Sequence, residues 1–224
     1  NEKVLFMGAG EAAVGIADLL VSAMVARSQV PHEAVRRSWL FDSRGLVVKS
    51  RTDIAPHKVK YAHDHPECTS FLEAVRRLRP TAIVGVAAVG GAFTPEVLRE
   101  MAALNARPIV FALSNPTSKS ECTAQEAYEH TGGRALFACG SPFDPVTIAG
   151  HGFVPRQGNN SYIFPGVGLG VMACGAKRVT DDMFLAAANA LVDCVTDEDL
   201  GQGSLYPPLP AIREVSARIA AAVA

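Results

Sequence analysis

An apolar run that leads into a glycine turn and then into a helical pattern is the strongest constraint on the fold of this chain. Val4–Met7 is followed directly by Gly8-Ala9-Gly10-Glu11-Ala12-Ala13, and apolar residues continue from there at helical spacing. A strand that ends in such a turn points the unpaired N–H groups of the helix toward an anion, typically a pyrophosphate. The first glycine permits the tight turn, the second lets a phosphate approach, and Ala13 keeps helix and strand close. The pattern therefore predicts a dinucleotide site.

Short apolar runs alternate with helical patterns along the rest of the chain, which is typical of βαβ units and a parallel sheet. We expect strands at Val4–Met7, Trp39–Phe41, Ala82–Val86, Ile109–Leu113, Leu136–Ala138 and Tyr162–Phe164. We expect helices at Glu11–Arg27, Cys68–Leu78, Pro95–Asn105, Ala124–Thr131, Gly168–Arg178, Asp182–Cys194 and Ala211–Val223. The predicted fold class is α/β, a Rossmann-like doubly wound, mostly parallel sheet with helices on both faces. It forms one domain over residues 1–224, whose helical C-terminal third (about 168–224) is expected to pack on the sheet.

Composition argues against several other classes of protein. Charged residues make up 19% of the chain, the net charge is −1, and no basic run interleaves with aromatic residues, so no nucleic-acid partner is expected. The longest apolar stretch, residues 12–26, carries Asp18 and is too short for a bilayer, so no membrane partner is expected. The five scattered cysteines indicate buried free thiols in a reducing compartment. Because the chain begins at Asn1 without a leader pattern, we expect a domain cut from a longer protein.

Small or polar residues follow each of the first five expected strands. They are Gly8, Asp42-Ser43, Ala87-Ala88, Ser114-Asn115-Pro116 and Gly140-Ser141-Pro142. The carboxyl ends of parallel strands open onto one crevice, where ligands bind in sheets of this class. We therefore expect these segments to share a single binding site.

The residues around Asp42 bear on the choice of dinucleotide. Asp42 ends the second expected strand, where a carboxylate usually accepts hydrogen bonds from the adenosine ribose of NAD. Ser43, Arg44 and Lys58 favour NADP instead, because a hydroxyl and two cations suit a 2′-phosphate. The spacing leaves both cofactors open, and it also leaves open the interpretation that residues 42–45 form only a hydrophilic turn.

Two segments rich in amides are candidates for substrate contact. Ser114-Asn115-Pro116-Thr117 places an amide at the mouth of the fourth strand, where it could bind a carboxylate or a nicotinamide. An ordinary Asn-Pro turn explains the same residues equally well. Gln157-Gly158-Asn159-Asn160 is a second dense cluster of amides, and loops of this composition are usually simple turns.

The titratable residues do not form a metal or proton-transfer site in the sequence pattern. We expect His57, His63 and His65, in a polar connection, to face solvent. Asp181-Asp182 fits the start of a helix, and residues 197–199 fit a solvated turn. No metal ligand and no catalytic acid or base is therefore assigned in this chain.

Six segments, taken in order, resemble the C-terminal, dinucleotide-binding domain of malic enzyme. They are residues 6–17, 85–88, 111–117, 140–146, 157–167 and 205–209, and the resemblance covers essentially the whole chain. Malic enzymes oxidise L-malate with NAD(P) and then decarboxylate the bound oxaloacetate with the help of Mg²⁺ or Mn²⁺, which yields pyruvate and CO₂. The chain is identified as a member of this family.

The resemblance implies roles for particular residues. Asn115 and Asn160 would contact malate, the Gly8–Ala13 turn would hold the pyrophosphate, and Val86-Ala87 with Ser114-Asn115 would line the cofactor pocket. Ser43 and Lys58 match the NADP-using forms of the family, so we expect NADP, with Asp42 turned away from the 2′-phosphate. NAD is the alternative.

The resemblance also implies what residues 1–224 do not carry. The family's tyrosine acid, lysine base, malate-binding arginine and three acidic metal ligands lie upstream of this domain. We therefore expect the isolated chain to bind dinucleotide weakly and to turn over no malate. The complete enzyme is expected to be a homodimer or homotetramer in the cytoplasm or a plastid. The alternatives are an NAD-linked malic enzyme, a related dehydrogenase, or a free-standing dinucleotide-binding module without catalysis.

Overall fold

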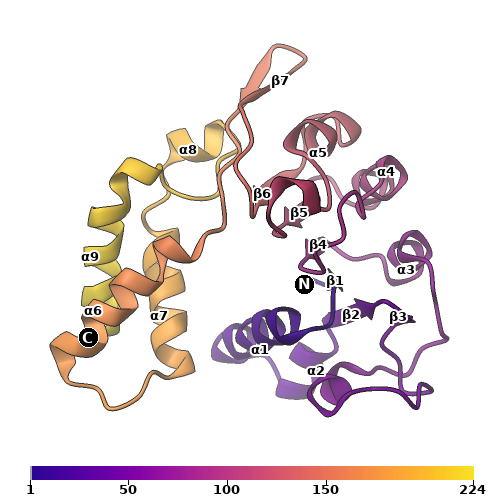
Figure 1. Cartoon of the computed structure of the whole chain (residues 1–224), viewed down its shortest axis with the longest axis horizontal. Helices are drawn as coiled ribbons and strands as arrows, with labels where there is room; N and C mark the ends of the chain where they lie inside the picture. Colours follow the sequence, from indigo (N-terminus) through magenta and orange to yellow (C-terminus); the bar gives the residue numbers. More distant parts are fainter. Residues whose placement is uncertain (1) are drawn as a thin grey trace.

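The computed structural model describes residues 2–224, which form a sheet part and a helical part side by side (Figure 1). The sheet has six strands in the order β3-β2-β1-β4-β5-β6. Their bounds are β1 Val4–Met7, β2 Ser38–Asp42, β3 Gly45–Leu46, β4 Ala82–Gly85, β5 Ile109–Ala112 and β6 Leu136–Cys139. All neighbours pair in parallel except β3, which pairs antiparallel with β2. The predicted α/β class with a mostly parallel sheet is confirmed.

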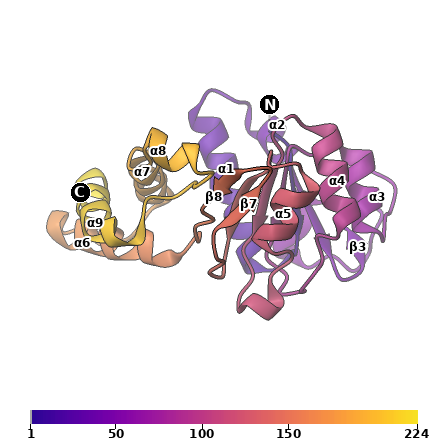
Figure 2. The same ribbon diagram turned by 90° about the horizontal axis from the view of Figure 1, so that it is seen from above.

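Helices cover both faces of this sheet (Figure 2). Alternate residues of β1 point to opposite faces, because side chains alternate along a strand. Val4 and Phe6 pack toward the helix α1 (Glu11–Ala26), whereas Leu5 packs toward the other face. That second face is covered by α3 (Phe71–Leu78), α4 (Pro95–Leu104) and α5 (Ala124–His130). The short helix α2 (Pro31–Val35) contacts α1.

The starts of these helices follow from local capping residues. Thr123 and Glu126 form the predicted capping box of α5, with hydrogen bonds in both directions. The Thr94 hydroxyl accepts from the Val97 N–H at 3.4 Å and Pro95 follows it, as predicted for α4. Helix α3 begins at Phe71 rather than at Cys68, because the hydroxyl of Ser70 caps it.

The helical part has a core of its own. It consists of α6 (Phe164–Cys174), α7 (Asp181–Val192), α8 (Asp197–Gly201) and α9 (Ile212–Val223). We expected this part to pack on the sheet, and that prediction is wrong. Both sheet faces are already covered, so α6, α7 and α9 bury their apolar residues against one another, and α7 contacts α1 rather than the sheet core. A Cβ at Gly166 would lie 2.6 Å from Cβ of Ile219, so the close crossing of α6 and α9 requires glycine.

The expected strand at Tyr162–Phe164 is also wrong. Tyr162 ends the 3₁₀ turn η3 (Asn160–Tyr162), and Phe164 begins α6, with Pro165 in its first turn. Proline suits that position because the first N–H groups of a helix have no partner within the helix. The aromatic residue serves a tertiary role instead, since the Tyr162 hydroxyl donates to the Pro207 carbonyl at 2.7 Å.

Several further elements lack a signal that we recognised in the sequence. They are α2, β3, the hairpin β7–β8 (Val146–Ile148 and His151–Phe153), the short helix α8, and the 3₁₀ turns η1 (Pro56–Tyr61), η2 (Thr117–Lys119) and η4 (Leu209–Ala211). All are short, so they carry too few residues for a periodic pattern. Among these missed elements, β3 matters for the site because it turns the chain back beside Asp42.

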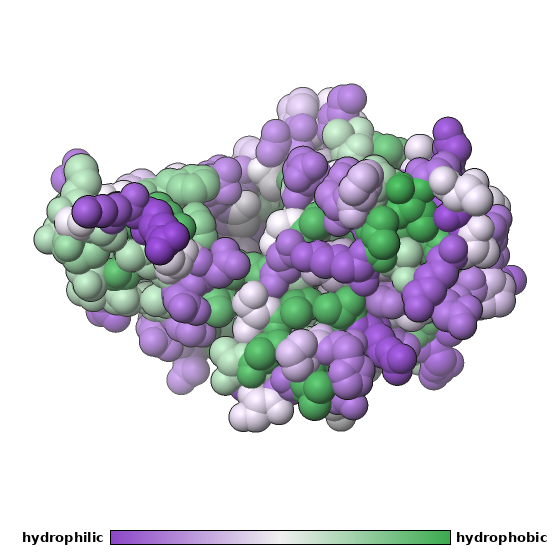
Figure 3. Space-filling model, turned by 90° about the horizontal axis from the view of Figure 1, so that it is seen from below, coloured by the Kyte–Doolittle hydropathy of each residue, from purple (hydrophilic) through white to green (hydrophobic). Residues whose placement is uncertain are grey.

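Apolar side chains reach the surface in both parts of the molecule (Figure 3). Apolar side chains spread over the helical part, at the left of that view, and Phe164, Leu169 and Met172 of α6 are exposed. Among residues 2–224, every helix falls short of the length or apolarity needed to cross a bilayer. The cysteines are free, as expected, but Cys174 is exposed rather than buried because it lies on the outer side of α6 at its last turn.

Candidate functional site

The turn after β1 requires glycine at Gly8 for two independent reasons. Gly8 has φ +126°, a backbone conformation that side chains disfavour. A Cβ there would also lie 3.1 Å from the backbone carbon of Val86, which follows β4. The Gly8 N–H donates to the Phe41 carbonyl of β2 at 2.8 Å. Backbone contacts with β2 and with the end of β4 thus hold the turn on both sides.

Gly10 has the opposite environment. It is the N-cap of α1, with φ −84°, and a Cβ on it would meet no atom within 4 Å. No side chain caps the helix, so the first-turn N–H groups remain for a ligand. Ala13 is fully buried against the sheet, which matches the role predicted for the third position of the motif. The start of α1 is therefore open and uncapped, while the residues beneath it are tightly packed against the sheet.

A cavity of about 670 Å³ lies over this turn at the carboxyl ends of β1, β2 and β4. It brings together most of the predicted cofactor residues: Gly8, Ala9, Gly10, Glu11, Asp42, Ser43, Lys58, Val86 and Ala87. Ala12 and Ala13 lie in α1 behind the turn, and Ser114 and Asn115 belong to the neighbouring end of the crevice. His57 and Val89 also line the cavity, although the sequence pattern did not single them out for it.

Asp42 does not offer a free carboxylate to this cavity. Its Oδ1 accepts from Arg51 Nη1 at 2.9 Å and from the Arg44 N–H at 2.9 Å. Its Oδ2 accepts from Arg51 Nη2 at 3.1 Å and from Lys58 Nζ at 3.3 Å. Burial by itself would raise the pKa of Asp42, but the hydrogen bonds from Arg51, Arg44 and Lys58 outweigh it and lower the pKa below its usual value.

Sequence reasoning missed Arg51, which holds the Asp42 carboxylate beside the cavity. Its side chain is only 8% exposed and lies between Asp42 and Asp53, with Nη2 at 2.8 Å from Asp53 Oδ2. The hydrogen bond to Arg51 lowers the pKa of Asp53 to about 2. Arg51 lies nine residues after Asp42, and the unpredicted strand β3 turns the chain back so that the two side chains meet. The Arg51 guanidinium binds the Asp42 carboxylate through two parallel hydrogen bonds. Of the two side-chain cations that contact Asp42, Lys58 is the more exposed.

At the neighbouring end of the crevice, Ser114 is held by a buried carboxylate. The Ser114 hydroxyl donates to Glu121 Oε1 at 2.5 Å and accepts from the Ala88 N–H at 2.9 Å, while the Ser114 N–H lies 3.3 Å from Glu121 Oε2. Glu121 is fully buried, and a Cβ at Gly85 would overlap its carboxyl group. This network links the ends of β4 and β5, and sequence reasoning missed Glu121 because nothing local marks it as buried.

The two predicted substrate amides leave the sheet at adjacent strands. Asn115 follows β5 and is exposed, with a cis peptide bond to Pro116. Gln157 forms an isolated parallel bridge with Cys139, the last residue of β6, so Asn160 follows on from that edge. In the β5–β6 register Cys139 lies opposite Ala112, only a few residues before Asn115. Both exposed amides therefore lie at the same edge of the sheet.

The whole chain matches one protein family. A sequence model described as the malic enzyme NAD binding domain matches residues 1–224. The chain belongs to the malic enzyme family. The glycine turn, the cavity above it and the amide segments are thus features of a malic enzyme domain.

Curated relatives agree with this assignment. The chain is 53% identical over 225 residues to the NADP-dependent malic enzyme of Columba livia, a match that covers 100% of the chain and 40% of that protein. It is 52% identical over 221 residues to the NADP-dependent malic enzyme of Homo sapiens, covering 98% of the chain and 39% of the relative. The human protein named as the mitochondrial NADP-dependent malic enzyme is 53% identical over 98% of the chain. The chain spans about two fifths of the length of these relatives.

Solved structures support the fold. The crystal structure of the Entamoeba histolytica malic enzyme superposes with a TM-score of 0.76 at 24% identity, over 99% of this chain and 42% of that one. The malic enzyme of Pyrococcus horikoshii Ot3 gives a TM-score of 0.74 at 23% identity, over 100% of this chain and 47% of that one. The Rossmann-like arrangement of the malic enzyme domain is thus shared with distant members of the family.

Two expectations about titratable residues of this domain are wrong. His63 is buried rather than solvent-facing, since its Nε2 lies 2.7 Å from the Ser38 carbonyl and its ring packs on Trp39. Burial lowers its pKa, although the contact with Ser38 opposes the shift. Asp199, expected in a solvated turn, is buried in α8 and pairs with Arg156. In both cases a tertiary contact supplies the polar partner that solvent would otherwise provide.

The described residues do not supply a metal site for the family's Mg²⁺ or Mn²⁺. Within residues 2–224 no group of three or more His, Cys, Asp or Glu side chains is placed to hold a metal ion. The clustered carboxylates Asp42 and Asp53 are engaged by Arg51, which makes them poor ligands. We therefore assign no chemical step in this domain to a metal.

Proposed function

We propose that this chain is the NADP-binding domain of an enzyme that converts L-malate to pyruvate and CO₂. The observation that carries the proposal is the group Ser43, Asp42, Arg51 and Lys58 beside the cavity over the glycine turn. The names of the curated relatives point to the same cofactor.

The charge arrangement favours NADP over NAD. An NAD site uses a free carboxylate at the end of the second strand to accept hydrogen bonds from the ribose hydroxyls. Here both oxygens of that carboxylate are already engaged by Arg51 and Lys58. Ser43 is exposed beside it and Lys58 carries a charge into the cavity, so together they suit a 2′-phosphate.

The remaining site residues extend this proposal along the crevice. The N–H groups at the start of α1 would hold the pyrophosphate, and Val86 and Ala87 would line the nucleotide pocket. Asn115 and Asn160 would orient malate at the adjacent strand ends, where an amide can donate to a carboxylate. When bound, NADP supplies the hydride acceptor, and the domain's own residues bind and orient.

The rest of the proposal concerns the complete protein. We propose that it is a homodimer or homotetramer, and that its acid, base and metal ligands lie outside residues 1–224. Residues 1–224 alone would then bind the dinucleotide weakly and turn over no malate. The proposed location is the cytoplasm or a plastid. A relative of similar identity is named as mitochondrial, so targeting experiments on the complete protein are required to test this point.

The test is malate-dependent NADPH formation by the complete protein in the presence of Mn²⁺. We expect NADP to be preferred over NAD by about tenfold or more in kcat/KM, and Asn160→Ala to lower kcat/KM for malate by about tenfold. Asn159→Ser is the matched control, because serine keeps an oxygen that can accept from the Ser161 N–H as Asn159 does. Equal use of NAD, or NADPH formation that does not depend on malate, would contradict the proposal.

A further inference from the structure

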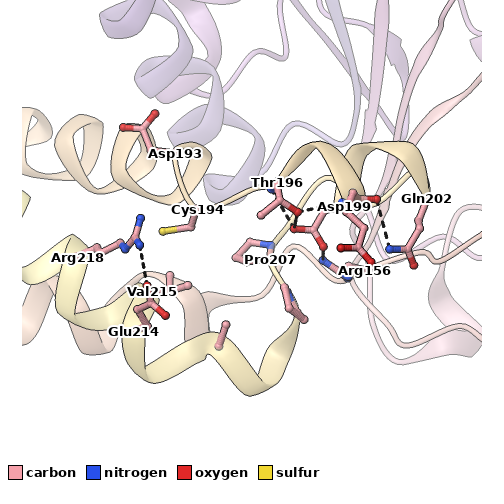
Figure 4. Close-up of a pocket in the computed structure, with 13 residues that line it drawn as sticks. Arg156, Asp193, Cys194, Thr196, Asp199, Gln202, Pro207, Glu214, Val215 and Arg218 are labelled. Carbon is pink, nitrogen blue, oxygen red and sulfur yellow. Dashed lines mark hydrogen bonds and ion pairs between the residues drawn. The ribbon is translucent and has the colours of Figure 1, made fainter.

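A buried ion pair joins Arg156, which is next in the chain to the loop of residues 157–160 (the Asn160 loop), to Asp199 of the helical part (Figure 4). Arg156 precedes Gln157-Gly158-Asn159-Asn160 in the chain, and Asp199 lies in α8 of the helical part. Of the ion pairs found within residues 2–224, the others connect residues of the same part. The pair lines a cavity of about 470 Å³ that is distinct from the cofactor cavity.

Arg156 makes two contacts with the helical part through one nitrogen. Its Nη1 donates to Asp199 Oδ1 at 2.6 Å and to the Tyr206 carbonyl at 2.5 Å. The Arg156 side chain is 15% exposed and that of Asp199 is 7% exposed. Water is therefore largely excluded, and the loss of either partner would leave an uncompensated charge in a mostly buried place.

Asp199 is held in turn by the start of its own helix. Its Oδ2 accepts from the Thr196 N–H at 3.0 Å and from the Thr196 hydroxyl at 2.8 Å. Burial opposes ionisation, but the hydrogen bonds from Thr196 and Arg156 outweigh it and lower the pKa of Asp199 below its usual value. The carboxylate therefore stays charged near neutral pH and connects Arg156 to the start of α8.

The Asn160 loop is also fixed from the sheet side. The Gly158 N–H donates to the Cys139 carbonyl at 2.8 Å, and Gln157 Nε2 donates to the Gly140 carbonyl at 3.0 Å. Tyr206 closes the loop from the helical side, since a Cβ at Gly158 would lie 2.9 Å from its hydroxyl. The loop thus lies between the end of β6 and the segment that Arg156 holds in place.

We propose that Arg156 and Asp199 are positioning residues that set the Asn160 amide for malate by tying its loop to the helical part. The inference rests on the proposed function, because it takes Asn160 as a malate contact. Neither charge reaches the crevice itself, so the pair acts through the backbone of residues 157–160. Loss of the pair lets the loop shift relative to β6, and a shift of this kind weakens malate binding more than NADP binding.

A second ion pair in the same cavity provides the matched control. Glu214 Oε1 accepts from Arg218 Nη2 at 2.7 Å, within α9 and one turn apart. These side chains are 67% and 56% exposed, and their hydrogen bond and ion pair are with each other rather than with residues 157–160. Figure 4 shows this pair on α9, apart from the contacts that join Arg156 to Asp199. Its removal changes the charge of the cavity without loosening the loop.

The experiment uses the complete protein and compares Asp199→Asn, Arg156→Met, Arg156→Lys and Glu214→Gln. We expect Asp199→Asn and Arg156→Met to raise KM for malate about tenfold, while KM for NADP changes less than about twofold. Arg156→Lys keeps the charge on a shorter side chain without the planar guanidinium, and it is expected to lie between these variants and the wild type. Glu214→Gln should match the wild type. The double variant Arg156→Met/Asp199→Asn should be no worse than the worse single variant, because the two residues act as one unit.

Amide hydrogen exchange in residues 157–162 provides a readout that does not depend on turnover. Faster exchange there in Asp199→Asn, with unchanged exchange in β1 and α1, supports the inference. Unchanged loop exchange, or an equal rise in KM for malate and for NADP, overturns it. A wild-type protein without malate activity refutes the proposed function and the role assigned to Asn160. The exchange data would then still decide whether the pair fixes the loop.

Discussion

At the end of the crevice proposed to bind the nucleotide, charged side chains border the cavity, whereas at the end proposed to bind malate the ionisable side chains are buried. Lys58 and Asp42 line the cofactor cavity, next to a turn whose shape depends on Gly8. At the other end the exposed groups are neutral amides, and the Glu121 carboxyl group and the Arg156–Asp199 ion pair are buried. Under the proposals made above, the exposed charges attract a phosphate directly and the buried ion pair holds a loop in place.

The physical reason lies in the ligands that each end is proposed to bind. A phosphate is a permanent anion, so a partly exposed cation beside it contributes attraction directly. A small substrate that must be oriented depends more on fixed geometry, because a displaced group loses much of its effect. Buried hydrogen bonds to Glu121 or Asp199 restrict motion without placing a further charge in the crevice.

The largest expected effect tests whether the turn needs its two glycines for different reasons, Gly8 for its backbone conformation and Gly10 for the free space beside it. Gly8→Ala should lower the free energy of unfolding by about 2 kcal/mol, because alanine is strained at a positive φ and would crowd Val86. NADP binding should weaken with it. Gly10→Ala should leave the free energy of unfolding within about 0.5 kcal/mol, because its Cβ would meet no other atom of the protein. It should still weaken NADP binding, because the same Cβ would enter the space proposed for the pyrophosphate.

Urea unfolding and NADP titration of residues 1–224 measure these two quantities. Gly15→Ala is the control, since Gly15 lies in α1 and a Cβ there meets no atom within 4 Å. If Gly8→Ala and Gly10→Ala lowered stability equally, the distinction between the two glycines would be wrong.

A smaller effect tests the charges at the nucleotide end. Lys58→Ala should weaken NADP binding about tenfold and leave NAD binding nearly unchanged, because only NADP carries the 2′-phosphate. Lys60→Ala is a suitable control, since Lys60 lies in the same 3₁₀ turn but pairs with Asp18 outside the cavity. NADP affinity that survives Lys58→Ala would contradict the assignment of the phosphate site.

The smallest expected effect concerns Arg51 and acid. Asp42 and Asp53 have folded-state pKa values below their usual range, so their ionised forms stabilise the fold above about pH 4. This contribution is lost as the pH falls toward about 2, through the lowered pKa of Asp53. Arg51→Gln should therefore lower the free energy of unfolding by about 1 kcal/mol at pH 6, from the partly buried pair with Asp42, and by much less near pH 2.

The single tryptophan of the chain, Trp39, lies in β2 close to Asp42 and can report this unfolding by its fluorescence. Arg44→Gln is the control, because the Arg44 side chain is 71% exposed. An equal difference between Arg51→Gln and the wild type at pH 6 and pH 2 would show that Arg51 acts by packing rather than by charge.

Much of the fold was predictable because its signals are local. The turn from β1 to α1 and the capping box of Thr123 and Glu126 depend on residues a few positions apart, and both are confirmed. The cavity also unites most of the predicted cofactor residues, since the ends of parallel strands meet at one edge. Their binding roles remain predictions.

The parts that were wrong or missed depend on contacts between distant segments. Asp199 and His63 occur in polar stretches typical of solvent-facing turns, yet both are buried against partners from other segments. Arg51 reaches Asp42 only because the very short strand β3 reverses the chain. A polar residue carries no local mark of burial, because its partner can come from anywhere in the chain.

The sequence by itself determined the family, the α/β class, the glycine turn and the strand ends at which the site lies, because each depends on residues close together or on motifs in fixed order. Only the tertiary structure decided that the helical part packs on itself, that Arg51 and Lys58 engage Asp42, and that Arg156 joins the two parts. The first outcome depends on which apolar faces remain uncovered, and the other two depend on which charges are brought together when the core closes. Burial then makes the pairing of a charge necessary, and the partner is chosen by geometry rather than by sequence distance.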